Sequence, residues 1–232
     1  MFHERQYASS TTPQQLLAAV YGWMSGGLLL STIVAFLTAS SPAVFLFLHK
    51  NPLVIFGLFF IQLGIGATLT TALPRLSFAT TLGLFFLYAG SMGLTLSSLL
   101  IIYTAASLVS TFLTCAGMFG AMALYGHFTR ADLSGIGSIC IMFLWGLCLA
   151  MIVNLFLGNA IFELLISAVA VAIFTLFIAY DAQRIKYVMA QQMGFDEQMA
   201  YKVTVLGAFC LYLDFINLFI HLLQFMGRRR EQ

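Results

Sequence analysis

The chain has 232 residues, of which 61% are hydrophobic and only 8% are charged. A soluble domain usually carries about 25% charged residues, so this composition excludes an ordinary soluble fold and indicates a multi-pass membrane protein. The formal net charge of +2 is too small to favour nucleic acid as a partner, and Arg228–Arg230 near the carboxyl end form the only basic cluster.

Apolar runs long enough to cross a bilayer occupy most of the chain. About 20 apolar residues span the hydrocarbon core, and prolines, glycines and polar residues divide the sequence into runs of about this length. The predicted spans are 16–39, 52–73, 78–100, 103–126, 133–157, 160–186 and 201–226. The break near Ile102 and Tyr103 is weak, so six spans plus a re-entrant segment is the alternative. The first run is longer than a signal-peptide core, so we expect it to be an uncleaved helix.

These spans predict an all-α membrane protein with one domain at residues 16–226. A polar amino-terminal segment, 1–15, precedes it, and a basic tail, 227–232, follows it. The longest polar stretch, 184–202, is interpreted as a helix extension, a turn at Gly194 and a helix start at Asp196 and Glu197. The four cysteines lie inside apolar runs and give no disulfide framework.

Orientation depends on lysine and arginine residues in short loops. With the amino terminus inside, six basic residues lie inside and four lie outside, so the pattern slightly favours an inside amino terminus and an outside carboxyl terminus. The arginine tail argues against this orientation. The inside set is Arg5, Arg75, Arg130, Arg184, Lys186 and Lys202, and the outside set is Lys50 and Arg228–Arg230.

The last span carries one polar stripe on an otherwise apolar helix. Its members recur at steps of three and four, which keeps them on one side of a helix. Polar residues inside a bilayer face the bundle or water, so we expect the last helix to be central and the other six to surround it. One alternative is a purely structural hydrogen-bond network. The stripe consists of Gly207, Cys210, Asp214, Asn217, His221 and Gln224.

A second acid, Asp181, follows the apolar run of the sixth span. One interpretation is a surface acid paired with Arg184 at i+3. Depth favours another: with the sixth helix continuing to about residue 191, Asp181 and Asp214 each lie roughly 15–20 Å from the same loop at 1.5 Å per residue. Two antiparallel neighbours would bring them together. Such a pair cannot easily ionise twice, so it should share a proton.

Three segments resemble the Bax inhibitor-1 family, namely 93–138, "IAYDAQRI" at 178–185 and "LYLDFINLFIHLLQ" at 211–224. The resemblance covers residues 16–226 and implies seven helices with the last one central, a pH-sensitive calcium leak, and suppression of cell death in eukaryotic members. It implies that Asp181 and Asp214 are the paired aspartates. It also implies that Arg75 is the arginine that can latch to the acids, although an ordinary positive-inside loop residue is the alternative.

The sequence departs from the family pattern in two places. Members commonly have Ser-Pro where this chain has Ser97 and Ser98, which puts a helix kink there in doubt. Some members carry an acid in the second span, where this chain has only Gln62 nearby, and this weakens the case for a second acidic ion site.

The pattern favours a calcium leak channel gated by a proton that Asp181 and Asp214 share. Calcium prefers oxygen ligands, so the same acids would bind it transiently, and Asn217 and His221 would extend the ion path. We expect no enzyme activity, no resident cofactor, and calcium ions, protons and the bilayer as partners; no protein partner is identified. The chain's compact length indicates a bacterial plasma membrane, with the endoplasmic reticulum as the alternative.

Two other functions are alternatives to the calcium leak. A membrane scaffold acting through partners is one, although the short loops offer little docking surface. An intramembrane aspartyl protease is the other, since it also uses two acids on neighbouring helices. Its second acid should follow Gly-x-Gly, whereas Leu211, Tyr212 and Leu213 precede Asp214 here.

Overall fold

The computed structural model describes residues 12–191 and 197–230, and those residues form helices joined by short turns. Seven helices are long and apolar enough to cross a membrane, as predicted, and the weak break near Tyr103 separates two of them. The helices are α1 (Pro13–Ser40), α2 (Pro42–Lys50), α3 (Pro52–Thr71), the 3-10 turn η1 (Leu73–Arg75), α4 (Phe78–Ile102), α5 (Ala105–Phe128), α6 (Ser134–Leu157), α7 (Ala160–Gln191) and α8 (Glu197–Met226).

Local sequence sets the helix ends. Pro13, Pro42 and Pro52 each stand in the first turn of a helix, where the missing N–H of proline costs nothing. As a result the segment between the first two spans forms the short helix α2 rather than a loop. Gly158 ends α6 with a left-handed φ of +60°, a conformation that glycine adopts without strain. The expected turn at Gly194 and helix start at Asp196 lie outside the described residues.

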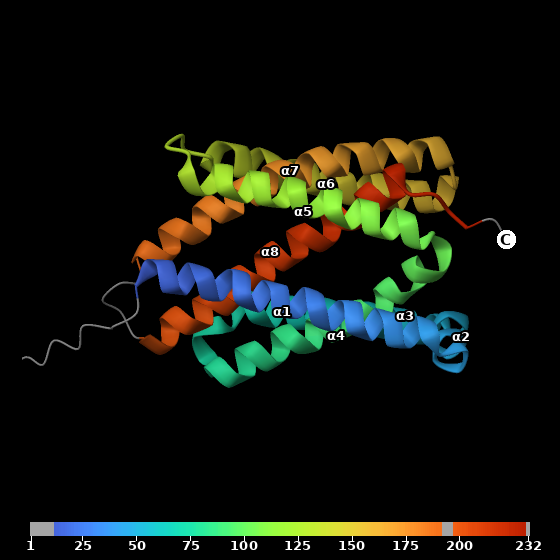
Figure 1. Cartoon of the computed structure of the whole chain (residues 1–232), viewed down its shortest axis with the longest axis horizontal. Coiled ribbons are helices and arrows are strands. Elements are labelled where there is room, and N and C mark those ends of the chain that lie inside the picture. The colour runs from blue at the N-terminus through green and yellow to red at the C-terminus, as the bar shows by residue number, and fades with distance from the viewer. Residues whose placement is uncertain (1–11, 192–196, 231–232) are drawn as a thin grey trace, which may run out of the picture.

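The long helices form two groups with α8 between them (Figure 1). In one group α4 packs against α1 and α3, and in the other α7 packs against α5 and α6. Helix α8 contacts α1, α4, α5 and α7 directly, whereas α3 and α6 lie further out. In the most apolar 18-residue window of α8, 61% of the residues are buried, against 11–39% in the corresponding windows of the other six spans. The last helix is therefore the most enclosed, with four rather than six close neighbours.

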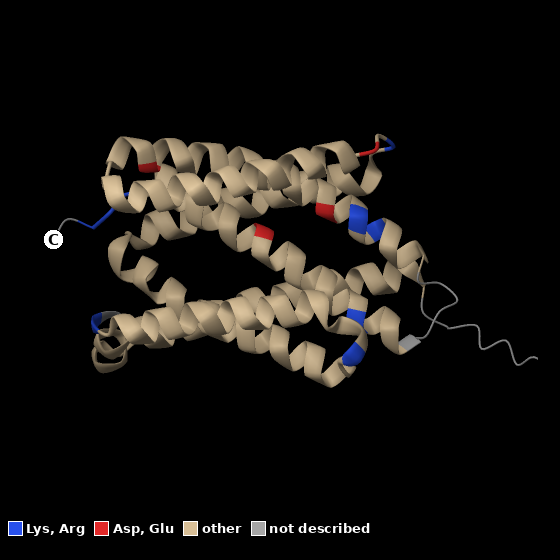
Figure 2. Ribbon diagram, turned by 180° about the vertical axis from the view of Figure 1, so that it is seen from behind, with Lys and Arg blue, Asp and Glu red and all other residues tan. Residues whose placement is uncertain are grey.

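The two ends of the bundle carry most of the charged residues (Figure 2). Helix α1 begins and α8 ends at opposite ends (Figure 1), which an odd number of crossings requires. We call these the amino end and the carboxyl end of the bundle. Among the described residues, five basic residues lie at the amino end and four at the carboxyl end, so charge counting leaves the orientation in the membrane as a prediction.

Helices α5 and α7 approach most closely at Gly126. A methyl group at this position would collide with the carbonyl oxygen of Ala179 on α7. Small residues allow such close approach between helices in lipid, where there is no hydrophobic force between them.

We predict that Gly126→Ala lowers the free energy of unfolding by about 1–3 kcal/mol, the usual cost of overpacking. Thermal unfolding of the purified protein in detergent would measure this loss. Gly120→Ala is the matched control on the same helix, because nothing lies within 4 Å of the added methyl group. Equal melting temperatures for the two variants would contradict the close approach.

Candidate functional site

Two acids from neighbouring helices meet inside the bundle. Asp181 lies on α7 and Asp214 on α8, and each is 5% exposed. A side-chain hydrogen bond joins the two carboxyl groups. The interpretation of Asp181 as a surface acid paired with Arg184 is therefore wrong.

This contact has a chemical consequence. An ionised carboxylate only accepts hydrogen bonds, so a bond between two carboxyl groups needs a proton on one of them. Asp214 Oδ2 is buried and, within the described part of the chain, has no hydrogen-bond partner. A pair bonded in this way would hold one proton, and Asp214 Oδ2 faces the interior without a partner among the described residues.

A small cavity of 100 Å³ opens from Asp181 toward the amino end, between α7 and α8. Cys210 and Gly207 of the predicted stripe line it, together with Arg184, which is exposed. Arg184 is the cation whose charge acts on Asp181. Positive potential at this opening would repel cations outside and stabilise the anionic form of the acid pair inside.

A larger cavity of 440 Å³ lies on the other side of the acid pair along α8. Asn217 and His221 line it together with apolar residues of α6 and Phe174 of α7. His221 lies seven residues beyond Asp214, which is about 10 Å along a helix. The predicted stripe thus faces two cavities, one on each side of the acids.

His221 is held in one orientation. Its ring stacks on Phe174, with centroids 6.0 Å apart and planes 15° apart, and Nδ1 lies 3.2 Å from Gln224 Oε1. The same oxygen accepts a hydrogen bond of 2.9 Å from the Ser167 hydroxyl. Because an amide oxygen only accepts, Nδ1 carries the proton, and Nε2 of the neutral ring is left as an acceptor.

Arg75 lies away from the acids. It occupies the exposed turn η1 at the amino end, and no hydrogen bond or ion pair joins it to either acid in the described part of the chain. The same turn is held by Lys202 of α8, whose ammonium group donates to the carbonyl oxygens of Pro74 and Leu76 at 3.4 and 3.1 Å.

Tyr212 makes a further polar contact of α8 that the sequence did not reveal. The Tyr212 hydroxyl lies 2.7 Å from Ser31 Oγ, and Ser31 donates to the carbonyl oxygen of Ala89 at 2.7 Å. This bond ties α8 to α1 and α4 on the side opposite the acids. A tyrosine in an apolar run is a sign that a hydroxyl needs a partner, but it does not identify that partner.

Comparison with known proteins agrees with this architecture. The family described as "Inhibitor of apoptosis-promoting Bax1" matches residues 13–231. The chain belongs to the Bax inhibitor-1 family. It is 45% identical over 217 residues to the inner membrane protein YbhL of Escherichia coli K12, with 94% of this chain and 93% of YbhL covered. Uncharacterized proteins of Borreliella burgdorferi and Rickettsia prowazekii are 40% and 38% identical, over 94% of this chain and 93% and 91% of their own lengths.

These similarities also decide the compartment. Seven apolar helices and a relative named as an inner membrane protein make this member of the Bax inhibitor-1 family a multi-pass protein of the bacterial inner membrane. The endoplasmic reticulum alternative no longer applies.

A proton shared by Asp181 and Asp214 would make the stability of the protein depend on pH. A folded state that binds one more proton than the unfolded chain loses stability as pH rises, by about 1.4 kcal/mol per pH unit while the difference is one proton. Asp181→Asn and Asp214→Asn should flatten this dependence, because an amide donates the same bond without titrating. Thermal unfolding in detergent between pH 5 and 8 would measure it.

Asp132→Asn is the control for this prediction, since Asp132 lies on the exposed turn between α5 and α6. Hydrogen bonds from the Ser134 side chain and from Ser134 N, the latter at 2.9 Å, hold the pKa of its carboxyl group below the usual value. It is therefore ionised throughout this range and should leave the wild-type dependence intact. A wild-type protein whose stability does not vary with pH would contradict the shared proton.

Proposed function

We propose that this protein is a proton-regulated cation leak of the inner membrane, chiefly for calcium, and that it is not an enzyme. The observation that carries this proposal is the buried hydrogen bond between Asp181 and Asp214, with a cavity on each side of it along α8. Acids at this depth are costly, by about 2.5–3.5 kcal/mol each even on the lenient insertion scale. Such a cost favours a functional role.

The gate follows from the chemistry of the pair. With one proton, the two carboxyl groups attract and hold α7 against α8. Loss of that proton leaves two anions in contact, whose repulsion is strong where water is scarce. The repulsion separates the helices and joins the two cavities, and the leak therefore rises with pH.

The same two anions would attract calcium. Calcium takes six to eight oxygen ligands, and the two carboxylates supply only part of this set. The remaining ligands would be water molecules and the side-chain oxygen of Asn217, which lies one turn from Asp214 and lines the larger cavity. An incomplete protein ligand set favours passage over tight binding. His221 Nε2, as an acceptor, would orient the water molecules beyond.

Calcium entry into liposomes at two pH values tests the gate. Wild-type protein should leak several-fold faster at pH 8 than at pH 6, whereas Asp181→Asn and Asp214→Asn should each show the same flux at both values. Asp132→Asn, a matched loss of one carboxylate outside the membrane, should behave like wild type. Variants that respond to pH as wild type does would reduce the two acids to structural hydrogen-bonding groups.

Substitutions of Arg184 and of Arg75 distinguish two hypotheses for this gate. The charge of Arg184 acts on Asp181, whereas the family resemblance implies that Arg75 latches the acids. We expect Arg184→Ala to move the half-maximal leak to higher pH, because the anionic pair loses its nearby cation. A full pH titration of flux would show this. A larger change with Arg75→Ala, above all a raised basal flux, would favour the Arg75 latch instead.

A further inference from the structure

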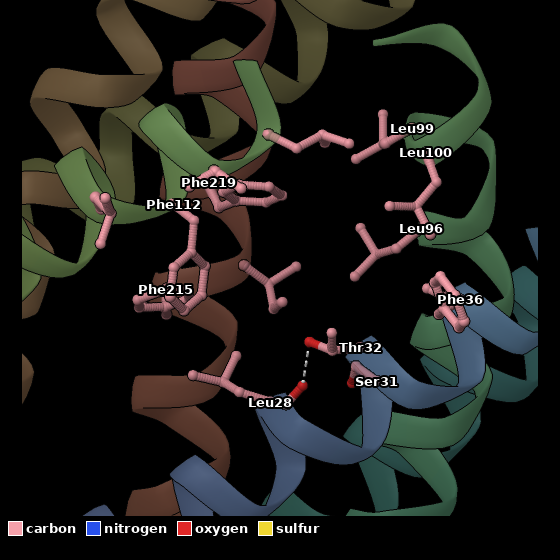
Figure 3. Close-up of a pocket in the computed structure, with 15 residues that line it drawn as sticks. Leu28, Ser31, Thr32, Phe36, Leu96, Leu99, Leu100, Phe112, Phe215 and Phe219 are labelled. Atoms are coloured by element: carbon pink, nitrogen blue, oxygen red, sulfur yellow. Dashed lines mark hydrogen bonds between the residues drawn. The ribbon is translucent and has the colours of Figure 1, made fainter. Parts of the chain in front are cut away.

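The bundle contains a third cavity that the proposed leak does not use. It has a volume of 280 Å³ and lies between α1, α4, α5 and α8 in the carboxyl half of the bundle (Figure 3). Its walls are almost entirely carbon. The lining includes Leu28 and Phe36 of α1, Leu96, Leu99 and Leu100 of α4, Phe112 of α5, and Phe215 and Phe219 of α8.

The two hydroxyl groups in the wall are already used. Ser31 Oγ donates to the Ala89 carbonyl and lies 2.7 Å from the Tyr212 hydroxyl, and Thr32 donates to the Leu28 carbonyl at 2.8 Å (Figure 3). The cavity therefore offers a ligand no free polar group. An engineered apolar cavity of about 150 Å³ stays dry and takes benzene, so this larger one suits an apolar occupant.

The cavity opens sideways toward lipid. Phe36, Val109 and Leu113 line it and are 64%, 61% and 64% exposed, although all three lie within membrane spans. The medium outside these residues is the hydrocarbon layer, and its available occupant is an acyl chain.

The carboxyl-terminal tail places positive charge beside this opening. Arg228 N donates to Ser107 Oγ at 2.9 Å and Arg228 O accepts from Thr104 N at 3.2 Å, while Arg230 N donates to Ile102 O at 2.8 Å. These hydrogen bonds hold residues 228–230, which we call the tail strap, against the turn between α4 and α5. Ser107 precedes Leu108, a cavity residue.

Two of the three tail arginines are available to a ligand. Arg229 pairs with Glu163 at 3.8 Å. Arg228 and Arg230 are exposed, and neither makes an ion pair within the described residues. Guanidinium groups bind phosphate through paired N–H donors. A phosphate at the membrane surface and a chain in the hydrocarbon layer are the two parts of one lipid.

We propose that the tail strap and the apolar cavity form one binding site for an anionic glycerophospholipid. Arg228 and Arg230 hold the phosphate of its headgroup, and one acyl chain enters between α1 and α5 to lie against Phe215 and Phe219. The site is separate from the acids, because Phe215 and Phe219 lie on the face of α8 opposite the polar stripe.

Native mass spectrometry of the full-length protein in detergent tests the headgroup half of the site. The probes are palmitoyl-oleoyl phosphatidylglycerol and the zwitterionic phosphatidylcholine with the same chains. We expect Arg228→Gln and Arg230→Gln each to weaken phosphatidylglycerol binding about fivefold, the equivalent of about 1 kcal/mol per surface cation. Lys50→Gln, at the carboxyl end but outside the site, should leave binding unchanged. Equal retention of both lipids, unaffected by the arginines, would overturn the proposal.

The chain half is tested in vesicles of phosphatidylglycerol that carries a photoactivatable group on one acyl chain. Crosslinks should concentrate on peptides of α1, α4, α5 and α8. Val109→Trp should remove them by filling the mouth, and it replaces a lipid-facing residue, so folding is retained. Val153→Trp is the matched control at a lipid-facing position of α6, 49% exposed, and should leave the crosslinks in place. Crosslinks spread evenly over all spans, or unchanged by Val109→Trp, would overturn the site.

Discussion

A hydrogen bond between two buried carboxyl groups, Asp181 and Asp214, constrains the rest of this structure. Neither acid could face acyl chains without a cost of about 2.5–3.5 kcal/mol on the lenient scale, and two charges in contact would add repulsion. One shared proton would remove half of the charge and turn the repulsion into a bond. The bond requires α7 and α8 to be neighbours at the depth of the acids, and burial of the pair fits the position of α8 between the two groups (Figure 1).

Covering α8 is a packing problem, because lipid offers no hydrophobic force between helices. The bundle solves it with close backbone approach and with hydroxyl groups that bond across helices. At Gly126 the backbones of α5 and α7 nearly touch, and at Ser31 a single hydroxyl links α1, α4 and the Tyr212 hydroxyl of α8. Ala179 lies two residues before Asp181 and Tyr212 lies two residues before Asp214, so these contacts hold α7 against α5 and α8 against α1 and α4 close to the acids.

The spans could be predicted from sequence because hydrocarbon thickness fixes the length of each apolar run. The meeting of Asp181 and Asp214 could also be predicted, because their distances from one loop along antiparallel helices are nearly equal. Helix α2 could not be predicted with the same certainty, because Pro42 and Pro52 are typical of loops as well as of the first turn of a helix. The alternative of a surface acid paired with Arg184 rests on i+3 spacing alone, which does not show that tertiary packing buries Asp181.

Contacts between distant segments could not be predicted, because no pattern in either segment indicates its partner. Nothing in residues 102–107 indicates that their backbone and Ser107 would bond the tail at 228–230, and Lys202 does not reveal that it holds the turn at Pro74. Such contacts depend on which helices become neighbours, and that is decided by the summed packing of all seven. Periodicity within one helix shows which face is polar, but it does not say what that face meets.

Helix α8 meets two different environments on its opposite faces. The stripe that contains Asp214, Asn217 and His221 faces α6 and α7, where polar atoms and cavities alternate. The opposite face presents Phe215 and Phe219 to a cavity with no free polar group. A cation in the cavity beside Phe215 and Phe219 would lose its water and gain no oxygen ligand. An acyl chain in the cavity beside Asn217 would leave the Asn217 amide without a hydrogen-bond partner. One helix can therefore separate an ion route from a lipid chain by the spacing of its polar residues, without any additional barrier between them.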